Sequence, residues 1–313
     1  MKNIKTFSLL LFIFGSLQTH ASVITSAGTF FDTDIAYAGV GGLRGNGSGD
    51  ITLSGTSGSI EQAYLYWHGP TNSSDPSFNA SALFNGTSIV GTNIGFSDDN
   101  FWGQDNSQAY RADVTNIITG DGIYSLSGLS PNNSNGASLV VYYDDGDDSN
   151  NTDVVTFEGN DANFDNIYDP LGWDTSLSGI NYNSGSARLL LGVSDGQSFA
   201  DGLFSINGSV VNVDFDGLSV PATAGSSVTN GALWDLFEFD VTSYLTVGLN
   251  SLNISYSGGS DALSAIHYQV ILPAGAAPDQ PDDVVAVSAP SISAYFILVL
   301  AGLIFCTRCN QLS

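Results

Sequence analysis

Two acidic segments contain the residues whose chemistry is easiest to name. One is the loop 144–153, and the other is the run 161–165, in which acids and an amide occupy alternate positions. Carboxylate and amide oxygens are the ligands that Ca²⁺ prefers. The candidate metal ligands are Asp144, Asp145, Asp147, Asp161, Asn163 and Asp165. Neither segment completes an EF-hand loop, so a solvated polar loop is the alternative interpretation. Ca²⁺ is the only cofactor that the sequence suggests.

Asp113 and Asp240 form a second pair, because each begins an Asp-Val-Thr segment. An acid that recurs in this way could ligate a cation. Each segment also precedes a short apolar stretch that can open a helical turn. Asp or Thr at such a point accepts hydrogen bonds from free backbone N–H groups. Capping is therefore the interpretation that we favour.

Two tryptophans, Trp102 and Trp173, lie in polar segments that resemble loops. An indole combines a large apolar face with one hydrogen-bond donor, so an exposed one can stack on a sugar ring. These two residues are the candidate ligand contacts, and the alternative, which we favour, is that they anchor their loops. Trp67 shares strand parity with Ala63 and Leu65, which predicts that it belongs to the core.

A catalytic constellation is not evident from the sequence. Between the two ends of the chain the histidines are His68 and His267, and neither belongs to a metal-binding motif. No G-x-S-x-G nucleophile elbow occurs. Glu238 and Asp240 share a strand face, but two acids on an outer face are usually solvated. We therefore expect no catalytic residues and no enzymatic activity, with a polysaccharide-active hydrolase as the third choice.

The charge of the chain restricts its partners. The 313 residues carry a formal net charge of -25, and the strong cations of the central body are Arg44, Arg111 and Arg188. Such a surface repels phosphate backbones, so nucleic acid is excluded as a partner. Both cysteines, Cys306 and Cys309, lie near the C-terminus, which leaves the body without a disulfide or a thiol nucleophile.

The elements that position the candidate residues are short segments in which apolar and polar residues alternate, as in β-strands, separated by Gly, Ser, Asn and Asp. A pattern recurs in two halves. The strand 63–67 corresponds to 187–191, and 84–86 corresponds to 206–208, each of these ending in the Asn-Gly pair of a hairpin. The strand 137–143 is matched with 264–270. We predict an all-β protein with two tandem antiparallel β-sandwich, jelly-roll-like domains.

The two ends of the chain carry targeting features. Lys2 and Lys5 precede the apolar run 7–17, and Ala21 ends a small-residue cleavage site. This order predicts a secretory signal peptide. Near the other end, a second apolar run at 291–307 is long enough for a short transmembrane helix, and Arg308 follows it.

The segment before that run carries a short motif, consisting of Val287, Ser288, Ala289, Pro290 and Ser291. Motif, apolar helix and basic end resemble the sorting tail of PEP-CTERM-type exosortase substrates. The resemblance implies an exosortase-like processing enzyme as a partner and membrane anchoring by the helix, transient or permanent. A single arginine replaces the usual basic cluster, so a plain C-terminal anchor is the alternative.

The first half contains AYLYW at 63–67, RADVT at 111–115 and GASLVVYY at 136–143. These strands resemble a poorly characterised β-sandwich domain of bacterial surface proteins. That resemblance implies a surface or extracellular role and assigns no catalytic residues.

We therefore expect a signal peptide at 1–21, β-sandwich domains at 22–160 and 161–275, a linker with the sorting motif at 276–290, a transmembrane helix at 291–307 and a short cytoplasmic tail at 308–313. The expected role is that of a non-enzymatic protein of the cell surface or the exopolysaccharide matrix, adhesive and stabilised by Ca²⁺. The alternative is a carbohydrate-binding module, with polysaccharide as its partner.

Overall fold

The computed structural model describes residues 23–98, 103–217 and 231–277. The prediction of an all-β protein built from antiparallel sheets is confirmed. No helix in these three ranges is long and apolar enough to cross a membrane. The predicted signal peptide, Trp102, the sorting motif and the transmembrane helix lie outside the described residues.

The first half of the chain supplies nine strands and a short 3-10 helix. They are β1 (Ile24–Val40), β2 (Gly49–Leu53), β3 (Ser59–Thr71), β4 (Ser81–Phe84), β5 (Thr87–Val90), β6 (Thr92–Ser97), β7 (Asn106–Asp113), η2 (Thr115–Ile117), β8 (Gly122–Ser127) and β9 (Gly136–Asp144). The hairpin between β4 and β5 turns at Asn85, whose φ of 47° is the positive value that the Asn-Gly pair predicts.

Among the described residues, the second half repeats this series without a counterpart of β6. Its elements are β10 (Thr152–Ala162), β11 (Asp174–Tyr182), β12 (Arg188–Ser194), β13 (Leu203–Ile206), β14 (Ser209–Val210), β15 (Trp234–Asp240), η3 (Thr242–Tyr244), β16 (Gly248–Ser257) and β17 (Ser264–Pro273). The expected boundary between residues 160 and 161 falls inside β10.

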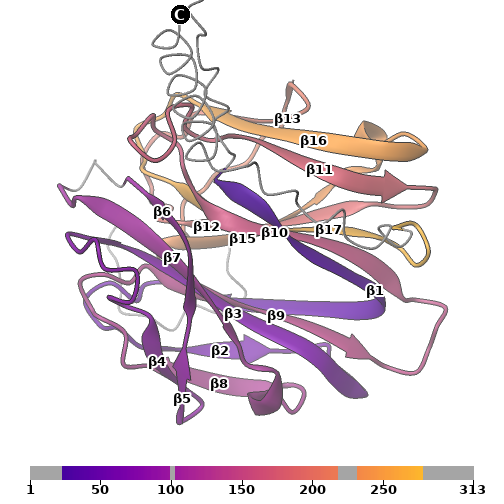
Figure 1. Ribbon diagram of the computed structural model, residues 1–313, viewed down its shortest axis with the longest axis horizontal. Coiled ribbons are helices and arrows are strands. Elements are labelled where there is room, and N and C mark those ends of the chain that lie inside the picture. Colours follow the sequence, from indigo (N-terminus) through magenta and orange to yellow (C-terminus); the bar gives the residue numbers. More distant parts are fainter. Residues whose placement is uncertain (1–22, 99–102, 218–230, 278–313) are drawn as a thin grey trace, which may run out of the picture. The chain divides into compact units, whose positions relative to one another are not determined.

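The strand order is the same in both halves. One nine-stranded sheet runs β15-β12-β17-β10-β1-β9-β3-β7-β6, and two four-stranded sheets run β2-β8-β4-β5 and β11-β16-β13-β14. The order β1-β9-β3-β7 thus recurs as β10-β17-β12-β15. Each small sheet covers one half of the large sheet, and an aromatic and aliphatic core fills each of the two spaces. Figure 1 shows these layers of the described body.

The long strand β1 connects the two halves of the large sheet. Its first part pairs with β10 and its second part with β9, and the register breaks between Phe30 and Thr33. Asp32 adopts a φ of 54° at this break, where the strand leaves one ladder for the other.

Strand β1 pairs with β10 along its first part and with β9 along its second part, and the two halves of the large sheet pack against each other. A third core lies between them and includes Tyr66, Tyr142, Leu190 and Trp234. The strand 63–67 alternates as predicted, with Ala63, Leu65 and Trp67 fully buried in the first sandwich. On its opposite face Tyr66 is fully buried and contacts His267 of the second half, while Tyr64 is partly buried.

In each Asp-Val-Thr segment the aspartate accepts a free backbone N–H at the start of a 3-10 helix, as predicted, while the N-cap residues Val114 and Val241 make no side-chain bond. Asp113 accepts hydrogen bonds from the Thr115 backbone N–H at 2.9 Å and from the Thr115 hydroxyl at 2.7 Å. Asp240 accepts the equivalent bond from the Thr242 backbone N–H at 2.9 Å. Each threonine Oγ in turn accepts a backbone N–H from the neighbouring strand. These aspartates are therefore committed to local turns.

Candidate functional site

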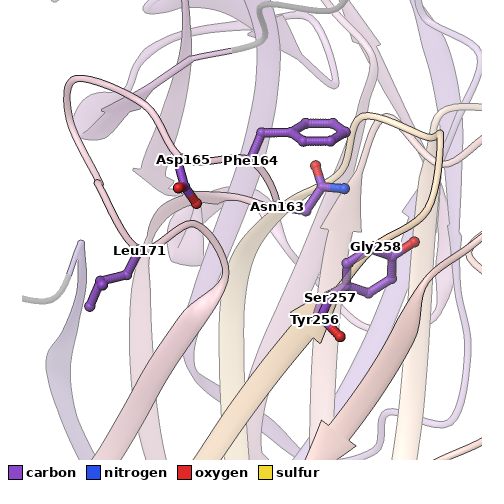
Figure 2. Close-up of a pocket in the computed structure, with 7 residues that line it drawn as sticks. All are labelled: Asn163, Phe164, Asp165, Leu171, Tyr256, Ser257 and Gly258. Atoms are coloured by element: carbon purple, nitrogen blue, oxygen red, sulfur yellow. The ribbon is translucent and has the colours of Figure 1, made fainter.

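A cleft of about 510 Å³ opens on the second half, between the loop 163–173 and the end of β16. Its lining residues are Asn163, Phe164, Asp165, Leu171, Tyr256, Ser257 and Gly258. Figure 2 shows Leu171 and Tyr256 on opposite sides of the space, with Asp165 and Phe164 along its upper edge. The volume lies in the range of small-ligand sites.

Side-chain hydrogen bonds to the backbone fix the loop that forms one wall. Asn163 accepts the Leu263 backbone N–H at 2.9 Å and donates to the Asp261 carbonyl at 2.8 Å. Further along, the Asn166 side chain accepts the backbone N–H groups of Tyr168 and Asp169. These local bonds replace the ladder that a loop lacks, so the wall has a defined conformation.

Tyr256 forms the opposite wall. Its hydroxyl donates to Asp201 Oδ1 at 2.9 Å and accepts the Gly202 backbone N–H at 2.6 Å. One face of its ring stacks on Trp173, with 5.6 Å between ring centroids. Burial and the nearby Asp201 carboxylate raise the pKa of Tyr256, so the phenol stays protonated and neutral.

The cleft joins apolar and polar groups. Leu171 is 63% exposed, Phe164 is half-buried, and Asp165 and Ser257 are exposed. Apolar side chains can pack on the C–H face of a ring, while carboxylate and hydroxyl oxygens accept hydrogen bonds from hydroxyl groups. The arrangement therefore suits a polyhydroxylated ligand with an apolar face.

Trp173 is not at the surface. It is 1% exposed, and its indole N–H donates to the Tyr268 hydroxyl at 2.8 Å. The candidate role of Trp173 in stacking on a ligand is therefore not supported, because both faces and the donor are used inside the core. Trp173 instead supports Tyr256 from beneath. Trp102, the second candidate ligand contact, lies outside the described residues.

The three candidate ligands of the loop 144–153 are turned onto their own backbone. Asp144 accepts the Gly146 N–H, Asp145 the Asp147 N–H and Asp147 the Ser149 N–H. Such turns are what a solvated polar loop provides. Within the described ranges, no three His, Cys, Asp or Glu side chains are grouped so as to hold a metal ion. The predicted ligands are thus not gathered into one cluster.

Asp161, Asn163 and Asp165 also occupy three separate environments. Asp161 is buried near the end of β10, Asn163 is bonded to the segment 261–263, and Asp165 is exposed in the cleft. The alternating pattern therefore does not produce an EF-hand-like ligand set.

The two histidines lie between the sandwiches. His68 Nδ1 is 2.7 Å from Ser194 Oγ, and His267 Nε2 is 2.6 Å from Ser138 Oγ. Both rings are fully buried, and burial lowers the pKa of His68 to about 3 and that of His267 to about 4. These serine–histidine pairs connect the two halves and are closed to a substrate.

Phe164, Leu171 and Tyr256 are the site residues that the sequence did not reveal. Phe164 and Leu171 lie in a polar loop, where nothing in the pattern distinguishes an exposed side chain from an anchoring one. Tyr256 lies in an alternating strand and resembles any core tyrosine. The sequence feature that pointed to this loop was the run 161–165, in which acids and an amide alternate.

No model of a known protein family matches the chain, and no curated protein matches it. Among solved structures the chain is similar to BpGH86A, a β-porphyranase of glycoside hydrolase family 86 from the human gut bacterium Bacteroides plebeius. The two sequences are 15% identical, and the TM-score is 0.22. The match covers 77% of this chain and 36% of the β-porphyranase chain. BuGH86 in complex with neoagarooctaose follows, with 12% identity, 80% and 34% coverage and a TM-score of 0.21. The chain thus spans about a third of these hydrolases.

The major capsid protein P2 from bacteriophage PM2 is also similar, with 11% identity, 76% and 98% coverage and a TM-score of 0.19. The expectation that the protein is not an enzyme is contradicted by the comparison, since the structures first found are those of glycoside hydrolases. TM-scores this low assign no reaction, substrate or catalytic residue to this chain.

Proposed function

We propose that this protein is a carbohydrate-binding protein of the bacterial cell surface or extracellular matrix, and that it binds a polysaccharide in the cleft of its second half. The observation that carries this proposal is the cleft itself. It combines apolar side chains at Phe164 and Leu171 with polar groups at Asp165 and Ser257. Binding sites for sugars combine both kinds of group in a defined geometry.

The proposed location rests on the two ends of the sequence. A signal peptide at 1–21 would export the chain, and the PEP-CTERM-like tail with its helix at 291–307 would deliver it to the envelope. An exosortase-like enzyme is the expected processing partner. The body that results is strongly acidic, which suits solubility in a screened, salt-containing medium.

The proposed architecture is a tandem of two jelly rolls. Its support is the strand order β1-β9-β3-β7, which recurs as β10-β17-β12-β15, and the small sheet that covers each half of the large one. In this arrangement the cleft belongs to one jelly roll only, since the loop 163–173 and β16 are both elements of the second half.

A glycan array with the purified protein, followed by calorimetry with the best ligand, tests the proposal. Leu171→Ala and Phe164→Ala should each weaken binding about tenfold or more, because each removes apolar contact from the cleft. Val90→Ala is the matched control, since Val90 is 71% exposed on β5 of the other half. The proposal is wrong if no polysaccharide binds, or if Leu171→Ala and Phe164→Ala bind as tightly as the control.

A further inference from the structure

The carboxylate of Asp161 is buried without a compensating group. Asp161 is 0% exposed, and neither of its oxygens has a hydrogen-bond partner among the described residues. A buried charge in this state is costly, because desolvation of a carboxylate is normally offset by donors or by a cation. Polar atoms of this kind point to a missing partner.

The neighbouring acids add to this cost. The carboxyl group of Asp169 faces Asp161, close enough for the two to share a hydrogen bond if one were protonated, and Asp174 adds negative charge at longer range. Burial and these two acids raise the pKa of Asp161 well above its usual range. Two facing carboxylates need either a shared proton or a cation between them.

We propose that Asp161 and Asp169 bind a single Ca²⁺ ion, which joins the end of β10 to the loop 163–173. Ca²⁺ accepts six to eight oxygen ligands and tolerates backbone carbonyls and water among them, so such oxygens would complete a site that the two carboxylates begin. The high net negative charge of the chain favours divalent cations over anions at any such position. The site is distinct from the acidic loop 144–153, whose carboxylates bind their own backbone.

The position of this ion gives it a role in the cleft. Asp169 Oδ1 accepts the backbone N–H of Leu171 at 3.0 Å, and its carbonyl accepts the Asn166 N–H at 2.8 Å. A cation held by Asp169 therefore fixes the segment that carries Leu171 against β10. Calcium should tighten ligand binding by ordering this wall in advance, a step that rests on the proposed function.

Thermal unfolding and calorimetry of the full-length protein, in Ca²⁺ and in chelator, test the proposal. The wild type should melt roughly 5 °C or more higher at Ca²⁺ concentrations about 100-fold above Kd. Asp161→Asn should melt in chelator at or above the wild-type temperature, since an amide can donate to Asp169. The same variant should gain nothing from Ca²⁺. Asp147→Asn, in the exposed acidic loop, is the control and should keep the full gain.

A wild type without a calcium-dependent gain would refute the cation site and leave a shared proton as the explanation. An Asp161→Asn variant with the full gain would refute it equally. Glycan affinity measured in both buffers separates the two proposals. If the protein binds sugar and Ca²⁺ changes neither this affinity nor the melting temperature, only the cation site is refuted. If Ca²⁺ raises the melting temperature and no sugar binds, only the carbohydrate function is refuted.

Discussion

Arg111 is the cation that joins the two halves of the body at Glu158. The guanidinium lies 2.8 Å from Glu158 Oε1, and the exposed fractions of the two side chains are 26% and 10%. Arg111→Met keeps the aliphatic length and leaves Glu158 buried without its counter-ion. Removing one member of a buried pair costs about 3–5 kcal/mol. The Tyr66 hydroxyl still donates to Glu158 at 3.2 Å, which favours the lower end, about 3 kcal/mol.

The pH dependence of this loss has a definite sign. Burial already raises the pKa of Glu158, and Arg111 lowers it again. Without Arg111 the pKa rises further, so the variant binds a proton more readily when folded than when unfolded. Its deficit relative to the wild type should therefore shrink as the pH falls through the raised pKa of Glu158.

Urea unfolding at pH 7 and at pH 5 measures both effects. The matched control is Arg188→Met, because the Arg188–Glu238 pair is 43% and 27% exposed and should contribute less than about 1 kcal/mol. The double variant Arg111→Met/Glu158→Gln should recover most of the loss, since it leaves no unpaired charge. A single variant Arg111→Met within about 0.5 kcal/mol of the wild type at pH 7 would refute the reasoning.

Three further results are expected. The wild type should lose stability between pH 6.5 and 4, because His267 binds a proton in the unfolded chain but not in the folded one, where its pKa is about 4. His267→Gln should make this loss smaller. An unchanged dependence of the unfolding free energy on pH, measured in urea, would contradict the prediction. Burial raises the pKa of Asp261 to about 8, so the stability that its protonation provides is lost as the pH rises toward 8. Asp261→Asn should remove this pH dependence, because the amide does not titrate, although it gives up one of the two bonds that the carboxylate accepts from the Gln197 and Ala262 backbone N–H groups. An unchanged slope between pH 4 and pH 8 in chemical unfolding would contradict this. Gly192→Ala places a Cβ on the His267 imidazole and should cost about 2–3 kcal/mol. Gly122→Ala should cost less than half as much, because the nearest atom to its Cβ is Tyr124 Cε2 at 3.7 Å, an ordinary contact distance.

The strands and their core faces could be predicted because alternation is a local property. Ala63, Leu65 and Trp67 were placed correctly on this basis. Register is not local, since a strand slipped by an even number of residues keeps the same faces. Leu139 pairs with Leu65, and Val270 pairs with Leu189, so Val270 is the equivalent of Leu139. The sequence match had aligned Leu139 with Ile266.

The packing of one half against the other could not be predicted. His68 and Ser194 are polar and distant in sequence, and each resembles a surface residue until the fold brings their side chains to 2.7 Å. Trp173 shows the converse error. It directly precedes β11 in a polar segment, but a loop position does not determine burial, and its indole fills the second core.

The location of a bound polysaccharide is the most direct test of the proposed function. Backbone amide chemical shifts of the isotope-labelled protein, titrated with the oligosaccharide selected on the array, report that location residue by residue. Perturbations should be concentrated at 163–171 and 256–258, around the cleft. Perturbations confined to the first half, or distributed over the sheet β2-β8-β4-β5 with the cleft unchanged, would contradict the account.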